Sequence, residues 1–153
     1  MKRILSSLSL FSLLILLSIL TACDKISQDS MLEGMWQLTE LTPATTAIPQ
    51  DKRAEAIYWS FQLQMMQIHT PSYLHNGKTS HTVGLFDRDG DLIHIRQVAI
   101  HYANRDSLIT DTSSTTLDQV GIHGTHADFQ IERLSHRQLI LQSDFCRLVL
   151  KKI

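Results

Sequence analysis

The sequence predicts an all-β domain in which about seven or eight short antiparallel strands form a closed barrel or a sandwich. Apolar and polar residues alternate with a period of two through most of the chain after residue 31. This is the pattern of strands that bury one face. Short clusters rich in Gly, Pro, Asn, Asp and Ser separate the alternating segments, and these residue types are typical of turns.

The N-terminus has the pattern of a secretory signal peptide. Lys2 and Arg3 form a positive head, and a serine-interrupted apolar run follows over residues 4–20. The run ends in small residues before a cysteine, in the order Leu-Thr-Ala-Cys at residues 20–23. These features favour a cleaved signal over a membrane-spanning helix. The ending resembles the lipobox of bacterial lipoproteins, which implies that Cys23 is acylated and becomes the first mature residue.

The predicted organisation has three parts: a lipoprotein signal peptide at 1–22, a lipidated tether at 23–30 and one β-domain at 31–153. Acyl chains on Cys23 would hold the protein to a membrane of the cell envelope without a spanning helix. The sequence leaves the inner and the outer membrane open as alternatives. The membrane is therefore the first expected partner.

The charge of the mature chain argues against a nucleic-acid partner. The signal peptide holds two of the 14 basic residues and none of the 15 acidic ones, so the mature chain carries a net charge of −3 at pH 7. A nucleic-acid-binding domain would present a basic stripe. Only Cys23 and Cys146 are cysteines. With Cys23 acylated, no disulfide can form within the chain, and the domain must be stabilised by packing.

The expected strands follow the alternating segments. They are 34–41, 58–69, the two arms of a hairpin within 80–97, 127–134, 138–143 and 144–152. Single helical turns are expected near 52–56 and 115–121, the second ending before Gly121. The residues between 99 and 116 lose the alternation and are expected to form a loop.

The segment 58–69 carries the strongest alternation. Its first apolar face comprises Trp59, Phe61, Leu63 and Met65. The phase then changes, because Met66 is apolar as well, and we interpret the change as a bulge in one bent strand. The four residues are predicted to line the barrel interior, where they form core and would contact an apolar ligand.

Gly34-x-Trp36 at the start of the first strand resembles the Gly-x-Trp signature of the lipocalins and their calycin relatives. The segments 59–68, 117–135 and 139–152 are similar to small lipocalin-like lipoproteins of bacterial envelopes. The resemblance implies an up-and-down antiparallel β-barrel of about eight strands.

In that family the tryptophan closes one end of the barrel and packs against a basic side chain near the last strand. The resemblance therefore implies that Gly34, Trp36 and Arg147 close the barrel, with Lys151 and Lys152 as alternative cations. An indole face beside such a cation would form a cation–π pair.

The motifs of metal sites and enzymes are weak or missing. His123 and His126 are close in sequence, but no cluster of further ligands stands beside them. Asp87, Asp89 and Asp91 resemble the start of a calcium loop that lacks its twelfth-position glutamate. The sequence has no phosphate loop, hydrolase elbow or zinc-protease motif. We expect no metal, no cofactor and no catalytic residues.

The predicted function is binding of a small, mostly apolar ligand inside the barrel. The alternative is a barrel filled by side chains, whose surface docks a protein partner in the envelope. An internal cavity of roughly 300 Å³ or more would favour the ligand. A filled core with an exposed apolar patch would favour the protein partner.

Overall fold

The computed structural model describes residues 30–71, 81–102 and 105–153. The chain divides into two units, Met1–Met31 and Leu32–Ile153, and the fold described below is that of the second. The expected signal peptide, Cys23 and the tether up to residue 29 lie outside the described residues. Within the described ranges, no helix is both long enough and apolar enough to cross a membrane.

Residues 30–32 are helical, and the described residues after them form ten strands and two short 3₁₀ helices. In chain order they are β1 (Gly34–Pro43), β2 (Gln50–Asp51), η1 (Arg53–Glu55), β3 (Tyr58–Gln62), β4 (Met65–His69), β5 (His81–Asp89), β6 (Leu92–Tyr102), β7 (Arg105–Leu108), η2 (Asp118–Val120), β8 (Ala127–Leu134), β9 (Gln138–Gln142) and β10 (Cys146–Lys152). Both expected helical turns are therefore confirmed, as η1 and η2. Of the loop expected between 99 and 116, the residues up to 102 continue β6 and Arg105–Leu108 form β7, whereas residues 109–116 form no strand or helix.

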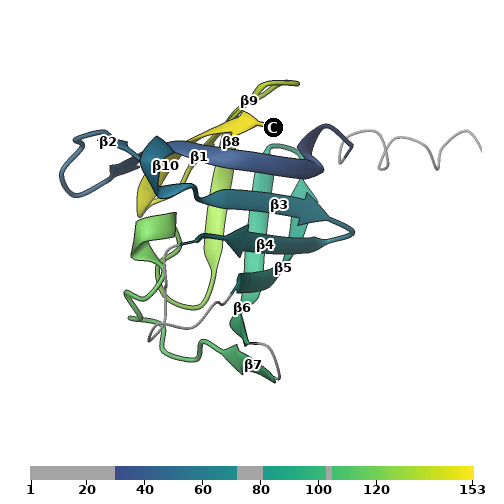
Figure 1. Cartoon of the computed structure of the whole chain (residues 1–153), viewed down its shortest axis with the longest axis vertical. Helices are drawn as coiled ribbons and strands as arrows, with labels where there is room; N and C mark the ends of the chain where they lie inside the picture. The colour runs from purple at the N-terminus through teal and green to yellow at the C-terminus, as the bar shows by residue number, and fades with distance from the viewer. Residues whose placement is uncertain (1–29, 72–80, 103–104) are drawn as a thin grey trace, which may run out of the picture. The chain divides into compact units, whose positions relative to one another are not determined.

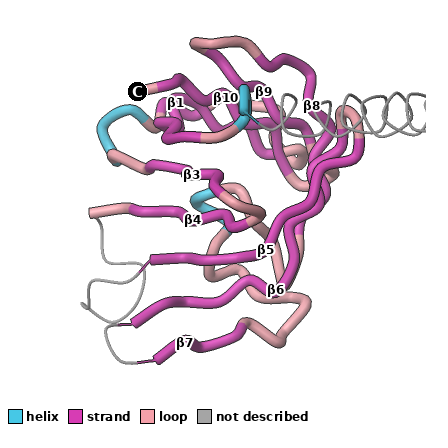
Figure 2. The backbone as a smooth tube through the Cα atoms, turned by 90° about the vertical axis from the view of Figure 1, so that its right-hand side faces the viewer, coloured by secondary structure: helices cyan, strands magenta, loops and turns pink. Residues whose placement is uncertain are grey.

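Eight of the strands close into an antiparallel barrel. Around the ring the order is β1, β3, β4, β5, β6, β8, β9 and β10, and β10 pairs back onto β1. Each barrel strand pairs with the next barrel strand along the chain, which confirms the predicted up-and-down barrel. β2 adds to β1, and β7 adds to β6. Figure 1 shows β1, β3 and β4 crossing in front of β5, β6 and β8, and Figure 2 shows β3 to β7 as successive strands.

The two ends of the barrel differ in their connections. At the closed end, where β1 begins and β10 ends, tight turns at 63–64, 90–91 and 135–137 join neighbouring strands. At the loop end lie the longer connections 44–57 and 109–126.

The barrel is filled by side chains at the level of its aromatic core. Trp59 on β3 and Phe129 on β8 stand four places apart in the ring of eight strands, and thus on opposite walls. Their rings meet edge to face with centroids 6.0 Å apart. Phe61 and Phe86 form a second edge-to-face pair at 5.1 Å. Because side chains from opposite walls touch, no open lumen passes this level.

The segment expected to be one bent strand is a hairpin. Leu63 and Gln64 form a two-residue turn between β3 and β4, with φ of 50° and 63°. Positive φ at both positions is the backbone of a type I′ turn. The turn explains the change of phase, because Phe61 and Met66 face each other across it and both point inward. Leu63 and Met65 are 79% and 53% exposed, so their predicted place in the lining is wrong.

A segment at the loop end is part of the core. Leu117, Val120 and Ile122, in and around η2, are fully or almost fully buried. Gly121 ends η2 with φ of 97°, a conformation that glycine adopts without strain. The Cys146 thiol donates a hydrogen bond to the Gly121 carbonyl at 3.4 Å. The last strand thereby holds the segment in place.

We expect Cys146 to resist alkylation in the native protein. Its side chain is buried, and burial raises the pKa of its thiol to about 11. The reactive thiolate is therefore scarce at pH 8. Peptide mapping after iodoacetamide treatment should find Cys146 unlabelled without denaturant and labelled with it. Fast labelling under native conditions would contradict the packing of β10.

Candidate functional site

The closed end is organised around Trp36. The indole is fully buried, and its Nε1–H donates a hydrogen bond to the Leu32 carbonyl at 2.8 Å. Trp36 pairs in register with Lys152 across the β1–β10 seam. The Lys152 Nζ lies 4.4 Å from the centroid of the indole ring. The strand seam and the cation–π pair therefore close the barrel together.

The spacing of the Gly-x-Trp motif has a direct structural cause here. Gly34 has φ of 113°, which disfavours residues with a Cβ. A Cβ at this position would also lie 3.1 Å from both Cε and Nζ of Lys152. The glycine thus leaves the space through which Lys152 reaches the indole of Trp36. The Lys152 ammonium also donates to the Glu33 carbonyl.

The prediction that Arg147 pairs with Trp36 is wrong. Arg147 lies at the other end of β10, where it is in register with Thr42. Its guanidinium Nε donates to Glu132 at 2.8 Å. Lys152, one of the two alternative cations, takes the position over the indole. Gly34 and Trp36 are in the places that the resemblance implied.

Two of the four expected lining residues lie inside the barrel. Trp59 and Phe61 are fully buried, and they pack on other aromatic rings. Within the described part of the chain, Trp59 Nε1 and Thr82 Oγ1 are buried polar atoms without a hydrogen-bond partner. Burying such a group unpaired costs about 1–3 kcal/mol.

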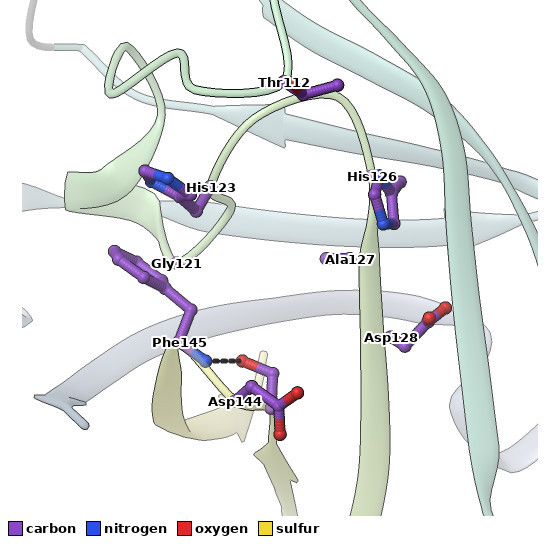
Figure 3. A pocket seen from close by; sticks show the side chains of 9 residues that line it. Thr112, Gly121, His123, His126, Ala127, Asp128, Asp144 and Phe145 are labelled. Carbon is purple, nitrogen blue, oxygen red and sulfur yellow. Dashed lines mark hydrogen bonds between the residues drawn. The ribbon is translucent and has the colours of Figure 1, made fainter.

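A cleft of about 260 Å³ opens at the loop end, beside the start of β8 (Figure 3). It is lined by Thr112, Gly121, His123, His126, Ala127, Asp128, Ser143, Asp144 and Phe145. Figure 3 shows His123 and Phe145 on one side of the hollow, with His126 and Asp128 on the other. Three separate segments of the chain therefore contribute its walls.

Hydrogen bonds and ring contacts orient the cleft walls. His123 stacks on Phe145 with ring centroids 5.1 Å apart and 21° between the planes. The His123 Nδ1 also lies 2.9 Å from an Asp118 carboxylate oxygen. On the other side, the carboxylate of Asp128 lies 2.8 Å from Nδ1 of His94. The cleft thus offers a fixed aromatic wall facing carboxylates and imidazoles.

The histidine pair noticed in the sequence, His123 and His126, lies in this cleft. Among the described residues, no group of three or more His, Cys, Asp or Glu side chains is arranged to hold a metal ion. The sequence did not indicate that Phe145 and Asp144, from a turn some twenty residues further on, share the cleft with the pair. Only strand pairing brings the two segments together.

A second hollow of about 430 Å³ lies beside the β3–β4 hairpin. It is lined by Gln64, Leu85, Phe86, Asp87, Arg96 and Gln97. Arg96 and Asp87 form an ion pair across it. Leu63 and Met65, whose side chains are exposed, belong to the same hairpin but do not line this hollow.

A row of histidines crosses the outer face of the barrel near the loop end. His69, His81 and His101 occupy paired positions on β4, β5 and β6, and Asp106 on β7 continues the row. Burial lowers the pKa of His81, and the neighbouring histidines His69 and His101 lower it further. This row is not apparent from the sequence, because its members are spread over 38 positions of the chain.

The closed up-and-down barrel with a Gly-x-Trp closure defines a lipocalin-like protein, a class that typically binds other molecules rather than transforming them. The family model described as a lipocalin-like domain matches residues 18–153, and the chain belongs to this family. No curated protein sequence matches the chain.

Two solved structures share the fold. A lipocalin-like protein from Bacteroides uniformis has a TM-score of 0.58 and 18% identity, over 80% of this chain and 99% of that one. An uncharacterized protein from Bacteroides eggerthii has a TM-score of 0.54 and 18% identity, over 79% and 98% of the two chains. At this identity the likeness concerns the fold alone.

We expect Trp36 and Lys152 to be energetically coupled and Trp36 and Arg147 to be independent. Double-mutant cycles with Trp36→Leu and either Lys152→Met or Arg147→Met, followed by urea unfolding, measure the coupling. The Lys152 cycle should give a coupling of about 0.5–2 kcal/mol, which is typical of cation–π pairs. The Arg147 cycle is the control and should be additive. Additivity in the Lys152 cycle would contradict the proposed seam contact.

Proposed function

We propose that the chain is a membrane-anchored binding protein of the bacterial cell envelope, which holds a small molecule in the cleft at the loop end of its barrel. The cleft is the observation that carries the proposal. Ligand sites in β-barrels occur preferentially at the mouth. We propose binding rather than catalysis, because the lining residues form no nucleophile–base pair of the kind that covalent enzymes use.

The anchor is supported by the sequence. A positive head, an apolar run and the Leu-Thr-Ala-Cys ending at 20–23 fit a lipoprotein signal. One acyl chain gives only reversible membrane binding, whereas two or more give a stable anchor. The diacylglycerol expected on Cys23 would therefore be sufficient.

The position of the ligand differs from the expectation of an apolar molecule inside the barrel. Trp59 meets Phe129 across the barrel, and this contact leaves no passage at that level. The cleft is hollow without any rearrangement of the core. Its volume of about 260 Å³ is slightly below the ~300–1,000 Å³ of drug-sized sites, so a small metabolite fits it best.

The lining indicates the chemistry of that molecule. Phe145 and His123 give a flat apolar wall for a ring or a short hydrocarbon. Asp128 and Asp144 supply carboxylates, and the histidines are the only ionisable groups of opposite sign in the lining. A carboxylate accepts its strongest hydrogen bonds from charged donors. We therefore propose a ligand with a planar apolar part and a protonated amine.

A second candidate function is docking of an envelope protein on the hairpin β3–β4. Leu63, Met65 and Leu85 are exposed, and Met65 and Leu85 are cross-strand neighbours. Exposed apolar side chains that lie together favour a contact surface. The filled core favours this reading too, since a docking module needs no internal cavity.

For the anchor, we expect Cys23→Ser to abolish labelling by radioactive palmitate and to leave the precursor uncleaved. The reason is that acylation needs the thiol as nucleophile. Cys146→Ser is the matched control, and it should keep both the label and the cleavage. Palmitate label on the Cys23→Ser protein would exclude the lipobox.

For the ligand, we expect native mass spectrometry of the protein, extracted from bacterial membranes in mild detergent, to show a copurified small molecule. Asp144→Asn should weaken binding by about 10–150-fold, the value of a hydrogen bond to a charged group. Asp89→Asn, at the closed end, is the control and should retain the molecule. Binding unchanged by Asp144→Asn, or no adduct at all, would contradict the cleft and favour the docking function.

A further inference from the structure

The pair His69 and His81 has a geometry that the proposed function does not use. The two side chains come from the last residue of β4 and the first residue of β5, which are paired in register. Their Nδ1 atoms lie 2.8 Å apart, and their ring centroids lie 4.6 Å apart. The pair stands on the outer face, because its neighbours Ile68 and Thr82 are buried inside.

In the absence of a metal, this contact requires one shared proton. A neutral imidazole donates from one ring nitrogen and accepts at the other. The Nδ1 of one ring therefore donates to the Nδ1 of its partner. An ion placed between the two Nδ1 atoms would replace that proton, and the donating ring would carry its proton on Nε2 instead. No net proton needs to leave the pair.

The distance between the nitrogens selects the type of ion. Imidazole nitrogens bind transition metals at about 2.0–2.1 Å. Two nitrogens 2.8 Å apart then form an angle of roughly 85–90° at the metal, which is the angle of square-planar or tetragonal sites. Tetrahedral zinc would need the nitrogens about 3.3–3.4 Å apart. Square-planar nitrogen coordination is typical of Cu²⁺ and Ni²⁺.

A third histidine lies on the next strand, beside the pair. His101 on β6 is in register with His81. Its Nδ1 lies 2.5 Å from a carboxylate oxygen of Asp106 on the neighbouring strand β7. A carboxylate on one ring nitrogen is the usual support for a histidine that binds metal through the other. Asp106 thus leaves Nε2 as the nitrogen with which His101 could bind a metal, although in the described conformation His101 does not complete a three-residue site with the pair.

We infer that His69 and His81 form a surface site for Cu²⁺, with their two Nδ1 atoms as its fixed ligands and water at the open positions, and that His101 becomes a third ligand when copper binds. Asp106 is the positioning residue of His101. The site lies on β4–β7, whereas the loop-end cleft is lined by other residues. Copper binding at this site can therefore be tested independently of ligand binding in the cleft.

The test is a titration of the metal-free full chain, purified in detergent, with Cu²⁺ alone, followed by electron paramagnetic resonance and by thermal unfolding. The wild type should bind one copper with nitrogen hyperfine structure. It should also gain thermal stability, as any ligand of the native state produces. His69→Asn and His81→Asn should each weaken binding at least a hundredfold. Asp106→Asn should weaken it about 10–100-fold, the usual cost of losing a supporting carboxylate.

His94 offers a matched control. It also lies on the outer face of the barrel and pairs with an aspartate, since its Nδ1 is 2.8 Å from Asp128. Its cross-strand neighbour on β5 is Asp87 rather than a histidine. His94→Asn should leave copper binding unchanged. Equal losses from His94→Asn and His81→Asn would overturn the inference, and so would unchanged binding in both His69→Asn and His81→Asn variants that melt like the wild type.

Discussion

The barrel depends on the seam between its first and last strands, where Lys152 reaches across Gly34 to the indole of Trp36. A sheet of eight strands has two free edges until β1 and β10 pair, and free edges expose unpaired backbone groups. The seam joins residues more than a hundred positions apart, so its closure carries a large entropic cost. Stabilising contacts at the seam offset this cost. They are the burial of the Trp36 indole, its hydrogen bond to the Leu32 carbonyl and the Lys152 ammonium over the ring.

The barrel interior is filled by side chains, and this limits the places where a ligand or partner can bind. With Trp59 and Phe129 touching across the barrel, binding surfaces are left to the two ends and the outer wall. The loop end has the cleft with its carboxylates, and the outer wall carries the histidine row. The closed end and its hairpin present apolar side chains. The fold serves as a rigid support, and the chemistry lies in the side chains around its rim.

The sequence predicted the fold well, because alternation and turn residues are local signals. It failed at Leu63-Gln64, since a type I′ turn normally carries Asn or Gly and the flanking apolar residues hid the reversal. It favoured Arg147 over Lys152 as the partner of Trp36, and this was wrong because the choice depends on the register of β1 with β10. The cleft and the histidine row were beyond prediction for the same reason. Each joins residues whose proximity arises only from the pairing of separate strands.

The burial of the segment around η2 determines what fraction of molecules can be open at the loop end. Leu117, Val120 and Ile122 leave the core if this segment lifts from the barrel. Exposing three such side chains costs about 5–8 kcal/mol, a large share of the ~5–15 kcal/mol that stabilises a whole domain. At 1.4 kcal/mol per factor of ten, the opened form would be only about one molecule in several thousand to one in several hundred thousand. The segment therefore keeps the loop end of the barrel closed in almost every molecule. A ligand would bind and leave at the surface of the protein, without passing into the barrel interior.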